Sequence, residues 1–259
     1  MGILNVTPDS FFDGGDHNTV EAAIDKVVQM LEEGATFIDV GGYSSRPDAT
    51  DISVDEETDR VVPIIEALVN NFPEVVISID TFRASVAEKS VQAGAAMVND
   101  ISAGLLDVTM LETVARLGVP YCMMHMRGTP KTMQKLTNYQ DITKEVIRYF
   151  SERIAAARVA GINDLLIDPG FGFAKTIAQN FELLSNLGLF QEMEVPILVG
   201  LSRKSMIYKT LELTSKEALN GTTALHMISL QQEAQILRVH DVKEAMQCIR
   251  LNSSLSQNK

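Results

Sequence analysis

Eight short apolar runs, each followed by a segment with helical periodicity, are the feature that most constrains the fold of this chain. The runs contain little polar alternation, which is typical of parallel strands covered on both faces. Eight strand–helix units in 259 residues predict a single (β/α)8 TIM barrel of the α/β class, forming one domain over residues 1–259. The runs cover residues 2–6, 36–40, 75–80, 96–100, 120–125, 165–168, 195–201 and 236–240.

An open doubly wound sheet is the alternative fold, because strand–helix alternation does not by itself prove closure. The count of eight favours the barrel, and no Gly-x-Gly-x-x-Gly follows the first run. We expect Asn18 and Ser53 to cap the first two helices, and Gly94, Gly118, Gly161 and Gly188 to end later ones. Since the first run starts next to residue 1, we expect the usual N-terminal barrel plug to be short or absent.

The charge of the chain limits its partners. A net charge of −12 and a pI near 4.8 argue against nucleic acid and against an anionic membrane surface, since both need a basic face. The two cysteines, Cys122 and Cys248, suit a reducing compartment. No run is long enough to span a membrane and no secretory signal is recognisable, so we expect a cytoplasmic protein.

Polar residues stand at the end of every predicted strand, and in a barrel these ends converge on one mouth. They are Asn5, Asp39, Asp80, Asn99, Asp100, His125, Asp168, Ser202, Arg203, Lys204, Arg238 and His240. Asp39 is the member that we expect to act structurally, as a helix cap. The acceptors of Asp80, Asn99 and Asp168 would suit a flat, nitrogen-rich ring.

Cationic residues also gather beyond the strand ends, although the chain is acidic overall. Seven of the 22 Lys and Arg residues lie there: Arg46, Arg83, Arg127, Lys175, Arg203, Lys204 and Arg238. Such a mouth predicts an anionic ligand such as a phosphate group. The glycine-rich loops 7–16 and 41–51 would close over it. The four histidines lack metal-ligand spacing, but Mg²⁺ held mainly by phosphate and water would need only one side-chain oxygen, such as that of Asn5.

Eight motifs at these strand ends identify a family resemblance. They cover residues 2–10, 45–47, 79–81, 98–100, 124–130, 168–173, 202–205 and 238–242, and they appear in order along nearly the whole chain. With them the chain resembles the dihydropteroate synthase family. The resemblance implies a homodimer that joins 6-hydroxymethyl-7,8-dihydropterin diphosphate to 4-aminobenzoate with Mg²⁺. Pyrophosphate would leave first, and the aniline nitrogen would then attack the resulting cation.

The resemblance also implies a role for each site residue. Asp80, Asn99, Asp168 and Lys204 would hold the pterin, with Arg238 against its face. Asn5, Asp13, Arg46, Arg238 and His240 would hold pyrophosphate and Mg²⁺. Phe11, Ser45, Pro47, Phe173, Lys204 and Ser205 would hold aminobenzoate, and Asp80, Lys204, Arg238, His240 and Asp13 form the catalytic set.

Two other functions are compatible with parts of this pattern. A noncatalytic or methyl-carrier pterin-binding barrel would keep Asp80, Asn99 and Asp168, but it would not need residues 202–205 or the pair Arg238 and His240. An aldolase would use Lys204 for a Schiff base. Within the family pattern, Ser45 replaces the usual Thr in the region where sulfonamides are expected to bind, so the sequence leaves sulfonamide sensitivity open.

Overall fold

The computed structural model describes residues 1–6, 16–44 and 50–257. Five predicted site residues lie outside these ranges: Phe11, Asp13, Ser45, Arg46 and Pro47. Each predicted run contains a strand, although the last two strands are much shorter than their runs. The strands are β1 (Gly2–Asn5), β2 (Phe37–Gly41), β3 (Val76–Asp80), β4 (Met97–Asp100), β5 (Tyr121–Met124), β6 (Leu165–Asp168), β7 (Leu198–Val199) and β8 (Ile236–Leu237).

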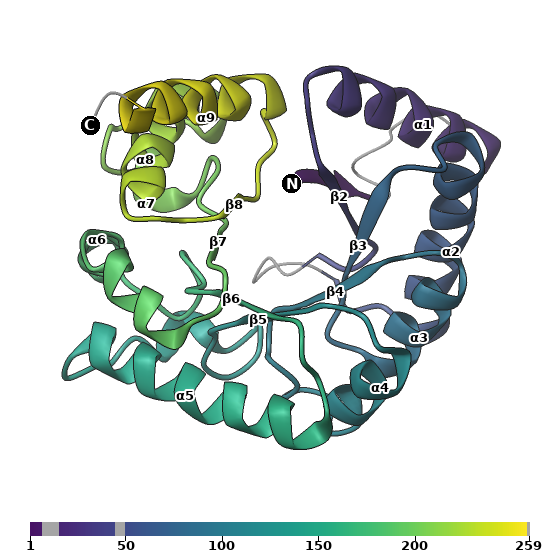
Figure 1. Ribbon diagram of the computed structural model, residues 1–259, viewed down its shortest axis with the longest axis horizontal. Helices are drawn as coiled ribbons and strands as arrows, with labels where there is room; N and C mark the ends of the chain where they lie inside the picture. The colour runs from purple at the N-terminus through teal and green to yellow at the C-terminus, as the bar shows by residue number, and fades with distance from the viewer. Residues whose placement is uncertain (7–15, 45–49, 258–259) are drawn as a thin grey trace.

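The strands close into a ring. β1 to β6 form one parallel sheet in sequence order, and β7 pairs with β8. Backbone hydrogen bonds join these sheets on both sides, from Ile167 N to Pro196 O at 3.0 Å on one side and from Ile3 N to Val239 O at 2.9 Å on the other. The strands therefore lie at the centre of Figure 1 with helices around them, and the predicted (β/α)8 barrel is confirmed over the open sheet.

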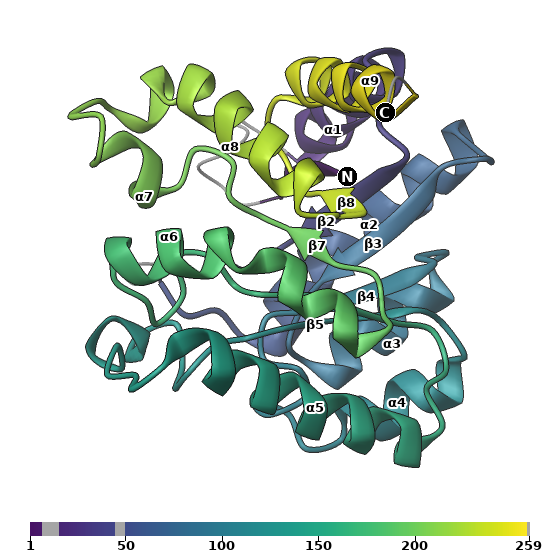
Figure 2. The same ribbon diagram turned by 60° about the vertical axis from the view of Figure 1, so that its left-hand side comes forward.

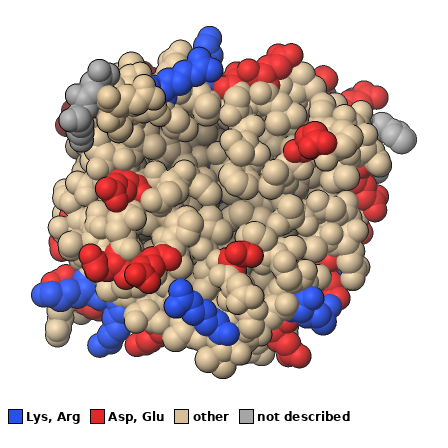
Figure 3. Space-filling model, in the orientation of Figure 1, with Lys and Arg blue, Asp and Glu red and all other residues tan. Residues whose placement is uncertain are grey.

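The helices form the outer layer, and Figure 2 shows the same arrangement from the side. They are α1 (Asp16–Glu32), α2 (Val54–Asn71), α3 (Ala84–Gln92), α4 (Met110–Leu117), α5 (Ile142–Ala160), α6 (Ile177–Ser185), α7 (Ser205–Tyr208), α8 (Leu219–Gln231) and α9 (Val242–Gln257). No helix within the described ranges is long and apolar enough to cross a membrane. On the face shown in Figure 3, basic side chains are separated by acidic or uncharged ones, so no continuous basic patch forms there.

The predicted helix boundaries are partly right. Ser53 caps α2 by accepting a hydrogen bond from Glu56 N at 3.0 Å, and Gly94, Gly118 and Gly161 take the positive φ that follows a helix. The Asn18 cap is wrong because α1 already starts at Asp16, an acidic residue that suits a helix N-terminus. Gly188 ends no α-helix, since α6 stops at Ser185 and a 3₁₀ helix, Leu187–Met193, follows.

Alternation along the strands separates two buried layers. One set of side chains, such as Ile38 and Ile79, packs outward with Ile65 of α2 in the main hydrophobic cluster. The other set points into the barrel, where Met97, Cys122, Leu166 and Leu198 form a separate apolar cluster. Because side chains two residues apart share a face, the next inward positions on those strands are Asn99, Met124, Asp168 and Gly200. The inward positions of these four strands are therefore apolar at their N-terminal ends, whereas Asn99 and Asp168 bring polar groups to the C-terminal ends beside Met124.

Candidate active site

Arg238 lies at the centre of the polar groups inside the barrel mouth. Its Nε donates to Asp39 Oδ2 at 2.5 Å, and its Nη2 donates to Asp80 Oδ2 at 2.6 Å. Asn99 Nδ2 donates to the same Asp39 oxygen at 3.0 Å. Strands β2, β3 and β4 and the end of β8 thus contribute to one network, and the prediction that Asp39 acts as a helix cap is wrong. The Asp39 side chain points into the barrel because it has the same inward register as Asp80 and Asn99.

The network is largely shielded from water. The Asp39 side chain is fully buried, whereas those of Asp80 and Arg238 are 19% and 20% exposed. The pKa of Asp80 is raised to about 7, because burial and the charge of Asp39 together outweigh the opposing effect of Arg238. Burial disfavours the charged form of Arg238, but the carboxylates of Asp39 and Asp80 outweigh burial and raise its pKa. Arg238 therefore stays charged, whereas Asp80 can change protonation near neutral pH.

Asp168 and Lys204 form the other side of the mouth. Asp168 is buried at the end of β6, and its Oδ1 accepts a hydrogen bond from Gly170 N at 2.8 Å. Burial raises its pKa, while the positive charge of Lys204 lowers it. Lys204 precedes α7, donates to the carbonyl of Phe171 and lies 4.8 Å from the ring centroid of Phe173. Burial lowers the pKa of Lys204 to about 8.

The loop after β6 holds Asp168 and Phe173 in place. Gly170 has a φ of 70°, and a Cβ at this position would lie 2.1 Å from the carbonyl oxygen of His125. Lys175 is buried beneath the loop, where its Nζ donates to Gly170 O at 2.8 Å and to Phe173 O at 3.0 Å and lies 2.9 Å from His125 Nδ1. Lys175 therefore stabilises the loop. The sequence-based prediction that it is a free cation of the mouth is wrong.

Ser202 orients the imidazole of His240. Its hydroxyl accepts a hydrogen bond from His240 N at 3.2 Å and lies 3.0 Å from His240 Nδ1. The hydroxyl proton can then be donated to Nδ1, which places the imidazole proton on Nε2. Desolvation at the mouth and the nearby charge of Arg238 lower the pKa of His240. His240 is thus set up as a neutral hydrogen-bond donor, and the residue as a whole keeps enough exposure for a ligand at the mouth to reach it.

Three further arginines predicted to line the mouth are bound to carboxylates of the chain. Arg83 donates to Glu57 at 2.8 Å, Arg203 contacts Asp241 through two nitrogens at 2.8 Å, and Arg127 pairs with Glu145. The prediction that these three arginines are free to bind an anion is therefore wrong. Among the described members of the seven predicted cations, Lys204 and Arg238 are left as the cations beside the buried carboxylates of the mouth. Arg46 lies outside the described residues.

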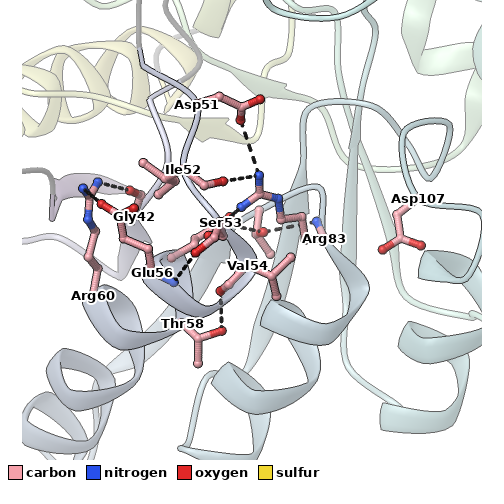
Figure 4. A network of polar contacts seen from close by, with 12 residues as sticks. Gly42, Asp51, Ile52, Ser53, Val54, Glu56, Thr58, Arg60, Arg83 and Asp107 are labelled. Atoms are coloured by element: carbon pink, nitrogen blue, oxygen red, sulfur yellow. Dashed lines mark hydrogen bonds and ion pairs between the residues drawn. The ribbon is translucent and has the colours of Figure 1, made fainter.

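Arg60 and Arg83 hold the backbone at the two ends of the glycine-rich loop 41–51 (Figure 4). Arg83 donates to Ile52 O at 2.7 Å and to Ser53 O at 3.0 Å, and Arg60 donates to Gly42 O at 3.1 Å. The backbone on each side of residues 45–49 is therefore held by an arginine from a neighbouring element.

The remaining predicted residues lie near the mouth at different depths. Asn5 is exposed at the end of β1, opposite Gly41 of β2. Ser205 is the first residue of α7, next to Lys204. Phe173 packs against a small apolar cluster of Ile101, Met124, Met126, Met133 and Ala174. The three methionines of this cluster are buried.

The fold and this site define the class of the protein as a (β/α)8-barrel enzyme whose mouth combines buried carboxylates with two cationic side chains. Residues 1–240 match the family described as "Pterin binding enzyme". The chain is 48% identical over 264 residues to the dihydropteroate synthase of Escherichia coli K12, covering 100% of this chain and 93% of that protein. It is 44% identical to the Haemophilus influenzae dihydropteroate synthase, with 93% and 88% covered. The chain therefore belongs to the dihydropteroate synthase family of pterin-binding enzymes.

Solved structures agree with this assignment. The Yersinia pestis dihydropteroate synthase in complex with a sulfonamide drug superposes with a TM-score of 0.93 at 45% identity, covering 100% of this chain and 94% of that one. The Xanthomonas albilineans enzyme with 4-aminobenzoic acid gives a TM-score of 0.92 at 44% identity, with 99% and 92% covered. The same enzyme with 7,8-dihydropteroate gives 0.89 at 42% identity, again with 99% and 92% covered. The resemblance inferred from the motifs is thus confirmed at the level of the family.

Proposed function

We propose that this protein joins 6-hydroxymethyl-7,8-dihydropterin diphosphate to 4-aminobenzoate and releases 7,8-dihydropteroate and pyrophosphate in folate biosynthesis. The observation that carries the proposal is the network in which Arg238 bridges Asp39 and Asp80. It places acceptors for a nitrogen-rich ring directly beside a fixed positive charge. The relatives named dihydropteroate synthase, and the complexes of such enzymes with aminobenzoate and dihydropteroate, support the same reaction.

The pterin would be recognised by acceptors at three strand ends. Asp80, Asn99 and Asp168 come from the C-terminal ends of β3, β4 and β6, and strand alternation places all three at inward positions. Carboxylate oxygens in such a buried position bind N–H groups strongly, because an unpaired carboxylate there is costly. The apolar cluster beside Phe173 would cover part of the flat ring.

The diphosphate would be held by Arg238 and by the Nε2–H donor of His240, with Lys204 close by. Mg²⁺ fits the residues that are present. The described part of the chain has no cluster of three His, Cys, Asp or Glu side chains suited to a metal, but Asn5 offers an exposed amide oxygen at the mouth. A hard oxygen of this kind suits Mg²⁺ that keeps most of its ligands from water and phosphate. When bound, the ion would neutralise charge on the leaving group.

The reaction would break the C–O bond to the diphosphate first. Pyrophosphate leaves with the electron pair, and the resulting pterin-methyl cation is stabilised by the ionised carboxylate of Asp80. The neutral amine of aminobenzoate then forms the new C–N bond and loses a proton. Among described residues, Phe173, Lys204 and Ser205 are the candidates to hold aminobenzoate, while Phe11, Ser45 and Pro47 lie outside the described residues.

The protein would act as a homodimer in the cytoplasm. Three apolar side chains around α7 and α8 stay exposed, namely Leu211 at 48%, Leu213 at 39% and Ile228 at 40%, and they offer a surface for a second copy. Sedimentation of the wild type and of Ile228→Lys tests this, since a dimer formed there would dissociate in the variant. Both cysteines are free and buried, which supports a reducing compartment.

Pyrophosphate release tests the reaction directly. The protein is mixed with the pterin diphosphate, Mg²⁺ and 4-aminobenzoate, and each component is omitted in turn. Release that requires aminobenzoate, with formation of dihydropteroate, supports the synthase. Pterin binding without product, under conditions where a control synthase turns over, would support the noncatalytic pterin-binding barrel instead. Borohydride trapping of Lys204 with a carbonyl substrate would support the aldolase.

A further inference from the structure

Asp39 makes contacts that a merely structural carboxylate does not need. Its Oδ2 alone accepts from both Arg238 Nε and Asn99 Nδ2, so it links the ends of β4 and β8 to β2. Its Oδ1 is buried and receives no hydrogen bond from any described residue. A single buried oxygen thus fixes the position of two groups that the proposed function assigns to pterin.

The contact with Asn99 sets which way the amide faces. A carboxylate only accepts hydrogen bonds, so the group of Asn99 that meets Asp39 must be the Nδ2 donor. This orientation leaves the Oδ1 acceptor of Asn99 for a ligand. Together with Asp80 and Asp168, the site then presents acceptors to the ring, which selects a ring edge that carries N–H donors.

The two hydrogen bonds of the Arg238 guanidinium differ in how easily a ligand could replace them. Nε is bound to the fully buried Asp39, whereas Nη2 is bound to Asp80, whose side chain is 19% exposed. A ring that donates N–H groups to Asp80 competes with Nη2 for the same oxygen. It does not compete with Nε, which lies on the carboxylate that is closed to solvent.

We propose that Asp39 is a positioning residue for the pterin, holding Arg238 by Nε and Asn99 by Nδ2 while the ring replaces Arg238 Nη2 at Asp80. This inference rests on the proposed function, because it concerns the same pterin. Arg238 then turns about a fixed point when the ring enters, and it remains beside the ring and the diphosphate. Asp39 itself touches no reacting atom.

Asp100 provides a matched control at a neighbouring strand end. It is also fully buried, but its oxygens accept from Ser102 and Gly104 of its own loop and from the hydroxyl of Tyr121. Both Asp39→Asn and Asp100→Asn replace a buried carboxyl group by an amide. Only Asp39→Asn puts an amide against two donors that belong to the site.

The test compares binding and turnover in these two variants below their unfolding temperatures. Calorimetry measures the Kd of the non-reacting alcohol 6-hydroxymethylpterin, and steady-state kinetics give kcat and the KM of each substrate. In Asp39→Asn we expect the Kd of the pterin to rise about tenfold or more, the size of a lost hydrogen bond to a charged group, while the KM of aminobenzoate changes little. In Asp100→Asn we expect a lower unfolding temperature, with the Kd of the pterin and the KM of aminobenzoate close to those of wild type.

A measurement on the wild-type protein keeps the proposal testable even if Asp39→Asn does not fold. In protein labelled with ¹⁵N-arginine, the Nε–H signal that disappears in Arg238→Lys belongs to Arg238. We expect this signal to be slow to exchange with water and to persist when 6-hydroxymethylpterin is added, while the Nη signals of Arg238 shift.

Two results would overturn the proposal: a pterin Kd in Asp39→Asn equal to that of wild type, or an Nε–H signal of Arg238 that exchanges freely once pterin is bound. An equal loss of pterin affinity in both variants would also reject it in favour of a structural role. Because the binding and spectroscopic measurements need no turnover, they remain readable if the protein proves not to make dihydropteroate.

Discussion

Replacing Gly170 by Ala should damage both stability and activity, because this glycine is required for two separate reasons. Its φ of 70° costs a residue with a Cβ about 1 kcal/mol, and that Cβ would lie 2.1 Å from His125 O. Relieving the overlap means moving the loop or β5, which costs a further 1–3 kcal/mol or so. We therefore expect Gly170→Ala to lower the free energy of unfolding by about 2–4 kcal/mol.

Gly118→Ala is the control for the backbone contribution alone. Gly118 has a φ of 67°, almost the same as Gly170, but a Cβ there meets nothing within 4 Å. We expect a loss of only about 1 kcal/mol, which corresponds to a decrease in unfolding temperature of about 2–4 °C in a chain of this size. Denaturant unfolding and circular dichroism measure both variants.

The two variants should also differ in turnover. Gly170 N donates to Asp168 Oδ1, so a displaced loop moves a carboxylate of the proposed pterin site. Gly170→Ala should therefore lose most turnover, whereas Gly118→Ala should keep it. Equal stability and equal turnover in the two variants would show that the close approach to His125 does not matter.

Three further predictions concern charge. The plot of kcat/KM against pH should be bell-shaped, because Asp80 is protonated below about pH 7 and Lys204 loses its proton above about pH 8. In Asp80→Asn the decrease on the acid side should disappear. Arg203→Ala should lower the unfolding temperature and leave the KM of the pterin diphosphate unchanged, because Arg203 binds Asp241 and two backbone carbonyls. A raised KM would show that Arg203 does contact the substrate. Removing Mg²⁺ with EDTA should stop pyrophosphate release without abolishing binding of 6-hydroxymethylpterin, and full release in EDTA would contradict the proposed metal.

The barrel and most of the site could be predicted because both follow from local patterns. Each strand is a short apolar run that ends in a polar residue, and the parallel order brings the ends together. Asp80, Asn99, Asp168, Lys204 and Arg238 were found in this way. Asp39 was read as a cap because a single strand-end aspartate has that local use. Counting alternate positions along β2 would have placed it inward, and this signal was available in the sequence.

The cations were harder to predict, because their partners are distant in sequence. Arg83 pairs with Glu57 of α2, Arg127 with Glu145 of α5, and Arg203 with Asp241 beyond β8. None of these pairs has a spacing that marks it as a contact. Lys175 is a similar case, since its carbonyl partners come together only when the loop after β6 has folded. Position near a strand end therefore does not establish that a charge faces the ligand.

Asp80 is the residue on which the proposed reaction depends most, because its carboxylate would hold the pterin and stabilise the cation. The decisive measurement is the rate of 7,8-dihydropteroate formation by wild type and Asp80→Asn at equal concentrations of folded protein, followed by chromatography of the product. We predict that wild type forms the product, and that Asp80→Asn unfolds at a similar temperature but loses about 10²-fold or more of the rate. Product formation by Asp80→Asn at the wild-type rate would contradict the account.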